Sequence, residues 1–280
     1  MNCLNGERYL EQSIKSLLSQ EYKNWELIFI DNNSNDNSSE IYRKFKDNRF
    51  KYFFLKKKVS LYKARNLALS KASGEYISFL DVDDFWDKKK LKIQVKELNN
   101  TNKNILYSNY YILKDKNKQI AFKQKMPEGF IHTQLSEKNF VPILTVIFRK
   151  KILSKYNFKF NNKYNIIGDF DLFFKMSKVI KFNYTNKALA TYRIHKNNFS
   201  ILNNKMYLKE YKAWLKKNQN TISNDEFNNF SKLINFMKIK ILIFDSRYKL
   251  AIYELLKFPM SKNKLKLFLY LFLPKKLFSF

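Results

Sequence analysis

Hydrophobic residues follow two different periods along residues 1–200. Short apolar runs rich in β-branched and aromatic residues predict strands. These runs are Trp25–Asp31, Phe50–Leu55, Tyr76–Asp81 and Asn104–Tyr111. Between them, apolar residues recur at helical spacing, as in Leu10, Ile14, Leu17 and Leu18. Alternating strands and helices predict an α/β fold, in which helices cover a mostly parallel sheet.

The later part of the chain has a different pattern. Residues 188–195 predict a further strand, and Gly168–Ile180 predicts a helix with acidic residues in its first turn. Beyond about Phe199 the sequence becomes helical, Lys-rich and aromatic. We therefore expect two domains, an α/β domain over 1–200 and a basic helical region over 201–280.

The charge is strongly positive and evenly spread. The 280 residues contain 54 Lys and Arg against 24 Asp and Glu, for a formal net charge of +30. Such a surface favours anionic partners. Nucleic-acid binders tend to present a basic stripe with stacking aromatics, whereas Lys occurs here in every segment, so we expect no nucleic-acid partner. Heavy use of Lys, Asn, Ile, Phe and Tyr indicates a coding bias, and part of the charge then needs no function.

Composition also bears on location. Cys3 is the only cysteine, which rules out an internal disulfide and favours a reducing compartment. The sequence shows no basic leader with an apolar stretch, and no run reaches the ~18 apolar residues that cross a bilayer. We expect a cytoplasmic protein.

Four carboxylates crowd into the segment GEYISFLDVDDFWD, at Asp81, Asp83, Asp84 and Asp87. If the preceding strand continues through them, Asp81 and Asp83 project to the same side. Two hard oxygen ligands suit Mg²⁺ or Mn²⁺, with phosphate oxygens completing the shell. The alternative is a polar turn that caps the next helix. Taken alone, the motif favours the turn.

Two further acidic positions also have two interpretations. Asp31 ends a predicted strand, and it either contacts a nucleobase N–H or stabilises a turn. Asp169 and Asp171 begin a predicted helix, where acids are common, but one of them could act as a general base. His195 ends an apolar strand and could join a metal site, whereas His132 is expected at the surface.

The order and spacing of these segments resemble a family 2 glycosyltransferase with the GT-A fold, a Rossmann-like α/β architecture. The resemblance rests on LIFIDNNSNDNS, ARNLALSKASGEYISFLDVDD, GDFDLFFKMS and YRIHKNNFS, and covers roughly residues 1–200. It implies an enzyme that moves a sugar from a nucleotide-sugar donor to an acceptor hydroxyl with inversion. It also implies a glycan or lipid-linked acceptor, as in surface polysaccharide synthesis.

The resemblance implies a role for each matching residue. Asn5 and Asp31 line the base pocket, and Arg65 lies near the diphosphate. Asp81 and Asp83 form the D-x-D element, with Asp83 the closer ligand of a Mn²⁺ or Mg²⁺ ion and His195 near that metal. Asp169 is the implied catalytic base.

The sequence departs from the family pattern at three places. Most of an apolar strand that usually precedes the segment NCLNGERYL is expected to be missing. Gly168 replaces a common Glu, and Asn32 replaces a common second Asp. A catalytically impaired relative is therefore an alternative to an active enzyme, and a basic membrane- or nucleic-acid-binding protein is another.

Residues 257–280 contain six Lys and no acidic residue among dense Leu and Phe. This composition suits a helix lying in a membrane interface, with Lys at anionic headgroups. The alternative is a helix packed on the catalytic domain. We therefore expect an anionic membrane surface as a partner, with the protein peripheral on the inner face of the cell membrane.

Overall fold

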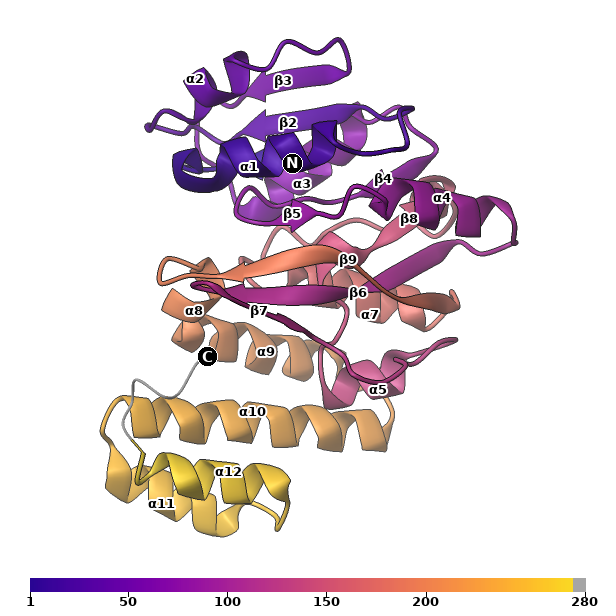
Figure 1. Ribbon diagram of the computed structural model, residues 1–280. Coiled ribbons are helices and arrows are strands. Elements are labelled where there is room, and N and C mark those ends of the chain that lie inside the picture. Colours follow the sequence, from indigo (N-terminus) through magenta and orange to yellow (C-terminus); the bar gives the residue numbers. More distant parts are fainter. Residues whose placement is uncertain (274–280) are drawn as a thin grey trace. The chain divides into compact units, whose positions relative to one another are not determined.

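The computed structural model describes residues 1–273, so the last residues of the predicted membrane segment, 274–280, lie outside the described part (Figure 1). The chain forms two compact units. The first comprises 1–132 and 140–195. The second comprises 133–139 and the residues from 196 onward.

A three-stranded parallel sheet opens the first unit. Its order is β1 (Asn2–Cys3), β2 (Leu27–Asp31), β3 (Phe50–Phe54), and Phe29 pairs with Tyr52. The helices between these strands are α1 (Glu7–Leu18), α2 (Ser38–Arg43) and α3 (Leu61–Lys71). In α1 the residues Leu10, Ile14 and Leu17 are buried, as their spacing predicts, and they pack around Phe29 and Leu80.

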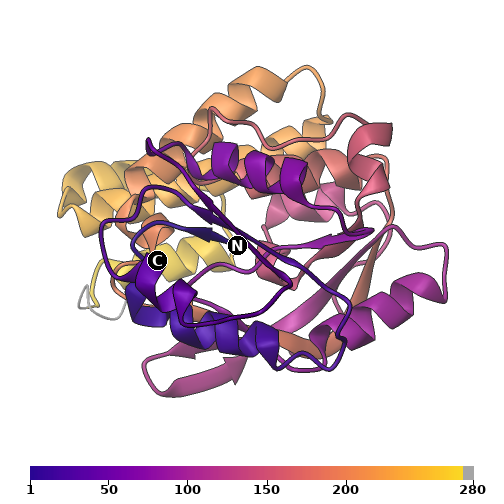
Figure 2. The ribbon, with the colours of Figure 1, turned by 90° about the horizontal axis from the view of Figure 1, so that it is seen from above.

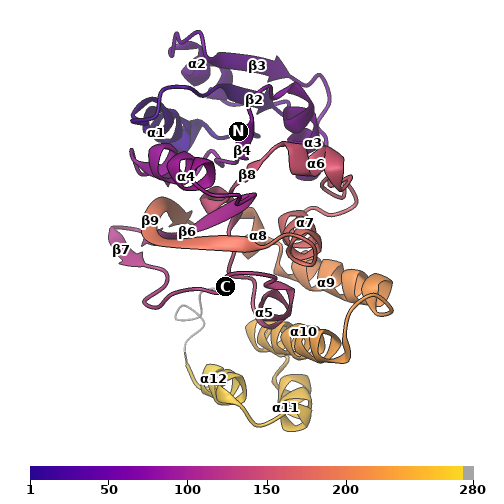
Figure 3. The same ribbon diagram turned by 90° about the vertical axis from the view of Figure 1, so that its right-hand side faces the viewer.

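The second sheet of this unit is mixed. Its order is β4-β8-β6-β9-β5, with β7 paired to β6, and only the β6–β9 pair is parallel. Its strands are β4 (Tyr76–Ser78), β5 (Phe85–Trp86), β6 (Ile105–Lys114), β7 (Asn117–Ile120), β8 (Ile147–Arg149) and β9 (Phe182–Ile194). The remaining helices are α4 (Lys90–Asn99), α6 (Lys151–Lys155) and α7 (Gly168–Ser177), with a 3-10 turn at Ile143–Thr145. Helices α1 and α4 lie on one side of the strands and α3, α6 and α7 on the other (Figure 3).

The expected α/β architecture is confirmed, with one local difference at β4. The predicted strand Tyr76–Asp81 ends at Ser78. Asp81 and Asp83 therefore lie in a loop, and the strand does not set the direction of their side chains.

The second unit is helical. It contains α8 (Phe199–Leu202), α9 (Asn204–Asn218), α10 (Asn224–Phe244), α11 (Tyr248–Lys257) and α12 (Lys262–Tyr270), while α5 (His132–Glu137) begins one residue before it. Ser223 and Glu226 form a capping box that fixes the start of α10. The expected helical C-terminal region is present.

The N-terminus lies inside the first unit, beside β2 (Figure 2). The Met1 amino group donates to the Ile28 carbonyl oxygen over 2.8 Å, and burial lowers its pKa to about 5. A cavity of about 500 Å³ adjoins Met1 and extends between β2 and β4, with Leu27, Ile77 and Trp86 in its wall. The predicted catalytic and metal-binding residues do not line this cavity.

Lys90 is a buried cation held by neutral partners. Its Nζ donates to Gln94 Oε1 over 2.6 Å and to Ser78 Oγ over 3.1 Å, and it lies 4.3 Å from the centre of the Trp86 ring. Burial lowers the pKa of Lys90 to about 7. Burying the charged Lys90 amine at neutral pH lowers the free energy of unfolding by on the order of a few kcal/mol.

This burial predicts a pH-dependent stability. Between about pH 7 and the ordinary Lys pKa, the unfolded chain binds a proton that the folded chain does not, so the Lys90 contribution to the free energy of unfolding increases with pH. The Lys90→Met variant should therefore gain most over the parent at pH 6–7 and lose that advantage by about pH 10. Urea unfolding across this range measures the difference. The exposed Lys92→Met variant is the control, and parallel pH curves for Lys90→Met and the parent would contradict the prediction.

Candidate active site

Arg65 and Asp81 form an ion pair at the centre of the site, in which the Arg65 side chain is buried and the Asp81 side chain is 33% exposed. Arg65, on α3, is 3% exposed, and its Nη2 donates to both oxygens of Asp81 over 2.8 and 3.0 Å. Burial acts to lower the pKa of Arg65, but Asp81, Tyr62 and Asp169 together hold it above its usual value. Arg65 therefore stays charged between two of the predicted site carboxylates.

Asp83 lies against His195, the two residues that the sequence predicts at a metal site. His195 Nε2 is 3.0 Å from Asp83 Oδ2, and the His195 ring packs on Tyr9 with ring centres 4.9 Å apart. Burial and the neighbouring Asp81 raise the pKa of Asp83, while His195 acts to lower it. The loop after β4 and the residue after β9 thus meet at one edge of the unit.

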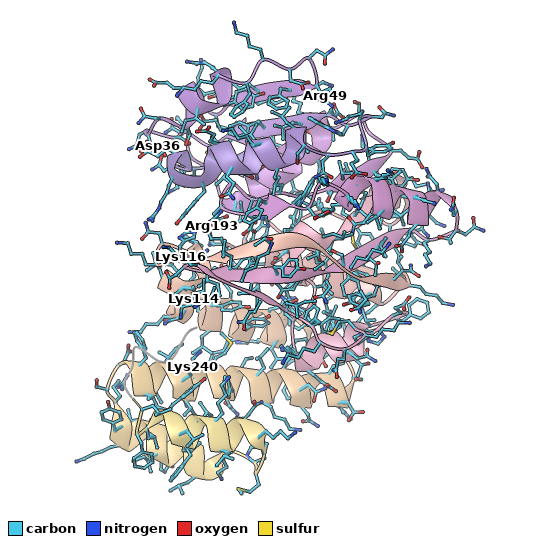
Figure 4. The ribbon with its side chains drawn as sticks, in the orientation of Figure 1. Asp36, Arg49, Lys114, Lys116, Arg193 and Lys240 are labelled. Carbon is cyan, nitrogen blue, oxygen red and sulfur yellow. The ribbon has the colours of Figure 1, made fainter. Side chains whose placement is uncertain are left out.

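Asp84 and Arg193 complete this cluster. The Arg193 backbone N–H donates to Asp84 Oδ1 and its Nε donates to the Asp83 carbonyl oxygen, each over 2.9 Å. Burial, followed by Asp83 and Asp81, raises the pKa of Asp84 well above its usual range. Arg193 extends from β9 toward this edge (Figure 4). The sequence predicts only that Asp84 caps the next helix. In the structure its carboxylate accepts a hydrogen bond from Arg193, near the end of β9.

The acidic cluster fits a divalent cation by its chemistry. Three carboxylates crowd together, and the pKa values of Asp83 and Asp84 are raised, which is the electrostatic state that a bound cation relieves. Asp83 and His195 supply an oxygen and a nitrogen donor, whereas Asp81 is engaged with Arg65. Within residues 1–273, no three His, Cys, Asp or Glu side chains converge as a complete metal site. Phosphate and water oxygens would have to complete the coordination shell.

Asp31 and Asn5 hold the loop after β2. Asp31 Oδ1 accepts from the Ser34 backbone N–H over 2.8 Å, and Asp31 Oδ2 accepts from the Tyr52 hydroxyl over 2.6 Å. Asn5, whose φ is +56°, accepts from the Asn35 N–H over 2.9 Å. The predicted base-pocket residues therefore lie together, and Asp31 also makes the turn contacts of the alternative interpretation. Each carboxylate oxygen can still accept a second hydrogen bond.

Asp169 begins α7 and points toward α3. Its Oδ1 accepts from the Phe170 N–H over 2.8 Å and lies 3.2 Å from the Tyr62 hydroxyl, whose shorter hydrogen bond, 2.6 Å, goes to the Ile166 carbonyl oxygen. Burial raises the pKa of Asp169, and Arg65 partly offsets this increase. Asp171 is instead buried with Lys175 Nζ at 2.7 Å from its Oδ2, which is a structural ion pair. Of the two acids that begin this helix, the structure brings only Asp169 toward Arg65.

Sequence reasoning missed two residues that touch the site, Tyr62 and Arg193. Tyr62 precedes Arg65 by three positions, so helical spacing puts both on one face of α3. Arg193 and His195 are two apart at the end of β9, so strand spacing puts both on one side. Arg193 stacks on Tyr9, with its guanidinium carbon 4.5 Å from the ring centre. Both signals were present in the sequence.

Gly168 is explained by Tyr62. A Cβ added at Gly168 would lie 2.6–2.7 Å from three carbons of the Tyr62 ring, which is itself buried against Phe160. A glycine at position 168, where the family commonly has Glu, therefore fits this structure, because the Tyr62 ring occupies the space that a side chain would need.

We predict that Gly168→Ala destabilises the protein by about 1–3 kcal/mol, because the new methyl group overpacks against a buried ring. Chemical denaturation measures the loss. Gly74→Ala is the matched control, since its added Cβ would meet only ordinary contacts at 3.5 and 3.9 Å. Equal stabilities of the two variants would contradict the packing shown here.

Comparison with known proteins places this architecture in a class. The family described as Glycosyl transferase family 2 matches residues 1–178. The chain belongs to glycosyl transferase family 2, and it is a glycosyltransferase with the GT-A fold.

Two curated relatives show the range of this family. An Escherichia coli enzyme named UDP-Glc:alpha-D-GlcNAc-diphosphoundecaprenol beta-1,3-glucosyltransferase WfgD is 34% identical over 163 residues, which cover 58% of this chain and 64% of that protein. The Bacillus subtilis protein named putative teichuronic acid biosynthesis glycosyltransferase TuaG is 27% identical, over 70% of this chain and 78% of that protein.

Solved structures share the fold. S. aureus TarS 1-349 in complex with UDP-GlcNAc has a TM-score of 0.61 at 19% identity, over 96% of this chain and 68% of that one. The Pyrobaculum calidifontis mannosyltransferase PcManGT, in complex with GDP-Man and Mn²⁺, has a TM-score of 0.63 at 13% identity, over 96% and 76%. At these identities the likeness concerns the fold.

Proposed function

We propose that the protein transfers a sugar from a nucleoside-diphosphate sugar to a hydroxyl of a lipid-linked glycan, with inversion at the anomeric carbon and with Mn²⁺ or Mg²⁺. The observation that carries the proposal is the crowding of Asp81, Asp83 and Asp84 beside His195. Asp169 lies against Tyr62 of α3, the helix whose Arg65 pairs with Asp81. In this arrangement one group of carboxylates would bind the metal–diphosphate, and a separate carboxylate would accept the proton of the acceptor hydroxyl.

The donor would lie along the ends of β2 and the loop after β4. Asp31 and Asn5 are proposed to hold the base, and Arg65 to supply positive charge near the diphosphate. Asp83 and His195 would hold the divalent ion, with Asp81 positioned by Arg65. When bound, the ion supplies a Lewis acid that stabilises the negative charge of the departing diphosphate.

Asp169 is the proposed general base. Its raised pKa makes it a better proton acceptor than an ordinary Asp, and the Phe170 N–H orients its carboxylate, with the Tyr62 hydroxyl nearby. The acceptor oxygen bonds to the anomeric carbon as its proton passes to Asp169. The bond from that carbon to the phosphate oxygen breaks, and its electron pair leaves with the diphosphate. A single displacement of this kind inverts the anomeric centre and needs no nucleophile from the protein.

The lipid-linked acceptor and a role in surface polysaccharide or glycolipid synthesis are supported by the names of the E. coli and B. subtilis relatives. Such an acceptor would place the reaction at the inner, cytoplasmic face of a cell membrane, with the protein bound peripherally. Among residues 1–273, no helix is long and apolar enough to cross a bilayer.

We predict that UDP or GDP together with Mn²⁺ raises the melting temperature, and that Asp83→Ala abolishes the increase because the metal–diphosphate loses its carboxylate. Thermal unfolding with each nucleotide, with and without Mn²⁺, measures the effect. Asp225→Ala, at an exposed position on α10, is the control and should retain the full increase. If neither nucleotide shifts the parent protein, the proposed donor site is wrong.

Asp169→Asn should lower the rate of sugar transfer by roughly 10²–10⁴, because the amide cannot take the acceptor proton. The nucleotide–Mn²⁺ increase in melting temperature should persist in this variant. Release of UDP from UDP-GlcNAc or UDP-Glc, stimulated by a bacterial lipid extract, measures transfer. Asp171→Asn, which removes the charge paired with Lys175, serves as the comparison and should keep its rate per folded molecule. An Asp169→Asn variant as active as the parent would exclude Asp169 as the base.

The same two experiments separate the alternatives. An impaired relative would bind nucleotide and Mn²⁺ without transferring sugar. A basic binding protein would show no nucleotide–Mn²⁺ effect, and nucleic-acid binding by it would weaken steeply with salt.

A further inference from the structure

Helices α11 and α12 expose large apolar side chains along one stripe each. In α12 and the residue after it, Leu265, Phe268, Leu269 and Phe272 recur at helical spacing and are 62%, 50%, 50% and 72% exposed. In α11 and the turn that follows it, the stripe consists of Ile252, Tyr253, Leu256 and Met260. Large apolar side chains exposed in this number are a feature of interaction sites when they form a contiguous patch. We call these eight residues the α11–α12 surface.

The opposite faces of the same helices form the core of the second unit. Ala251, Leu255 and Leu267 are buried, and they cluster with Ile239 and Ile243 of α10. Both helices lie on the same side of α10 in two views (Figures 1 and 3). The fold therefore uses one face of each helix, and the α11–α12 surface is not needed to hold the helices in place.

Basic residues are interspersed in sequence with the residues of this surface. Between positions 247 and 273 the chain carries Arg247, Lys249, Lys257, Lys262, Lys264 and Lys266. The one acidic residue in that range is Glu254, which is paired with Lys238 at 2.9 Å. A second copy of this chain would bring like charges together at such a surface, whereas an anionic layer would complement it.

We propose that the α11–α12 surface docks the protein on an anionic lipid bilayer. The apolar stripes enter the boundary between headgroups and acyl chains, and the Lys side chains meet the phosphates. Helix α12 has 9 residues, so it lies in the plane of the interface and does not span the membrane. The docking surface extends the sequence expectation for residues 257–280, because it includes Ile252, Tyr253 and Leu256 of α11, which lie before residue 257.

This inference deepens the proposed function, on which it rests for its meaning: docking would bring the enzyme to the membrane that holds a lipid-linked acceptor. Its physical basis is separate, because the surface belongs to the second unit and the proposed catalytic residues belong to the first. Membrane binding and nucleotide binding can therefore be measured independently.

The test is co-sedimentation of the full chain with vesicles of phosphatidylcholine alone and of phosphatidylcholine with phosphatidylglycerol. The parent protein should bind the phosphatidylglycerol vesicles at least tenfold more tightly, and salt should weaken that binding. The Leu256→Ser/Phe268→Ser/Phe272→Ser variant should lose at least tenfold in affinity. Phe54→Ser, an exposed apolar position of the first unit, is the matched control and should bind as the parent does.

Each result decides the proposal. Equal binding of the triple variant and the parent, or no binding of the parent, would overturn it. A parent dimer that dissociates in the triple variant would assign the surface to a second copy of the chain and would also overturn it. The melting-temperature increase with nucleotide and Mn²⁺, measured in the same triple variant, should persist and shows that the first unit is folded. A far-UV circular dichroism spectrum matching that of the parent shows that the helices of the second unit are retained. If nucleotide and Mn²⁺ raise the melting temperature of neither the parent nor the triple variant, the proposed donor site is wrong, and the membrane result is unaffected.

Discussion

Repulsion among closely spaced carboxylates is the constraint on which the site depends. Asp81, Asp83 and Asp84 lie within four positions, and burial makes their mutual repulsion more costly than it would be in water. Arg65, which is buried against Asp81, compensates part of this charge, and the backbone N–H of Arg193 donates a hydrogen bond to Asp84. The remaining excess of negative potential at Asp83 is what a divalent cation would neutralise.

Much of the fold could be predicted from hydrophobic spacing. Helix α1 and strands β2 and β3 appear where the periodicity places them. Helix α1 and β2 bury apolar residues in the core, and β3 packs the partly buried Phe50 and Tyr52 against it. The end of β4 could not be predicted in this way, since Phe79 and Leu80 continue the apolar run after the ladder has ended at Ser78. Burial of those two side chains, and not strand pairing, accounts for the extended hydrophobic pattern.

The candidate site was predictable in its residues and less so in their partners. Asp31, Asp83, Asp169 and His195 were identified by position and resemblance, but a sequence does not state which donor each carboxylate meets. Asp81 pairs with Arg65, and Tyr62 lies between the position of Asp169 and the absence of a side chain at Gly168. These relations arise from contacts between α3, the loop after β4 and α7, which are distant in sequence.

The central claim is that Asp83 holds a divalent ion against the diphosphate of an activated sugar. A crystal of the protein grown with UDP-GlcNAc and Mn²⁺, analysed by anomalous scattering at the manganese edge, tests it most directly. The account predicts a manganese peak within bonding distance of the Asp83 carboxylate and of two phosphate oxygens, with Arg65 still on Asp81. A nucleotide bound with its diphosphate away from Asp83, and no manganese at that carboxylate, would contradict it.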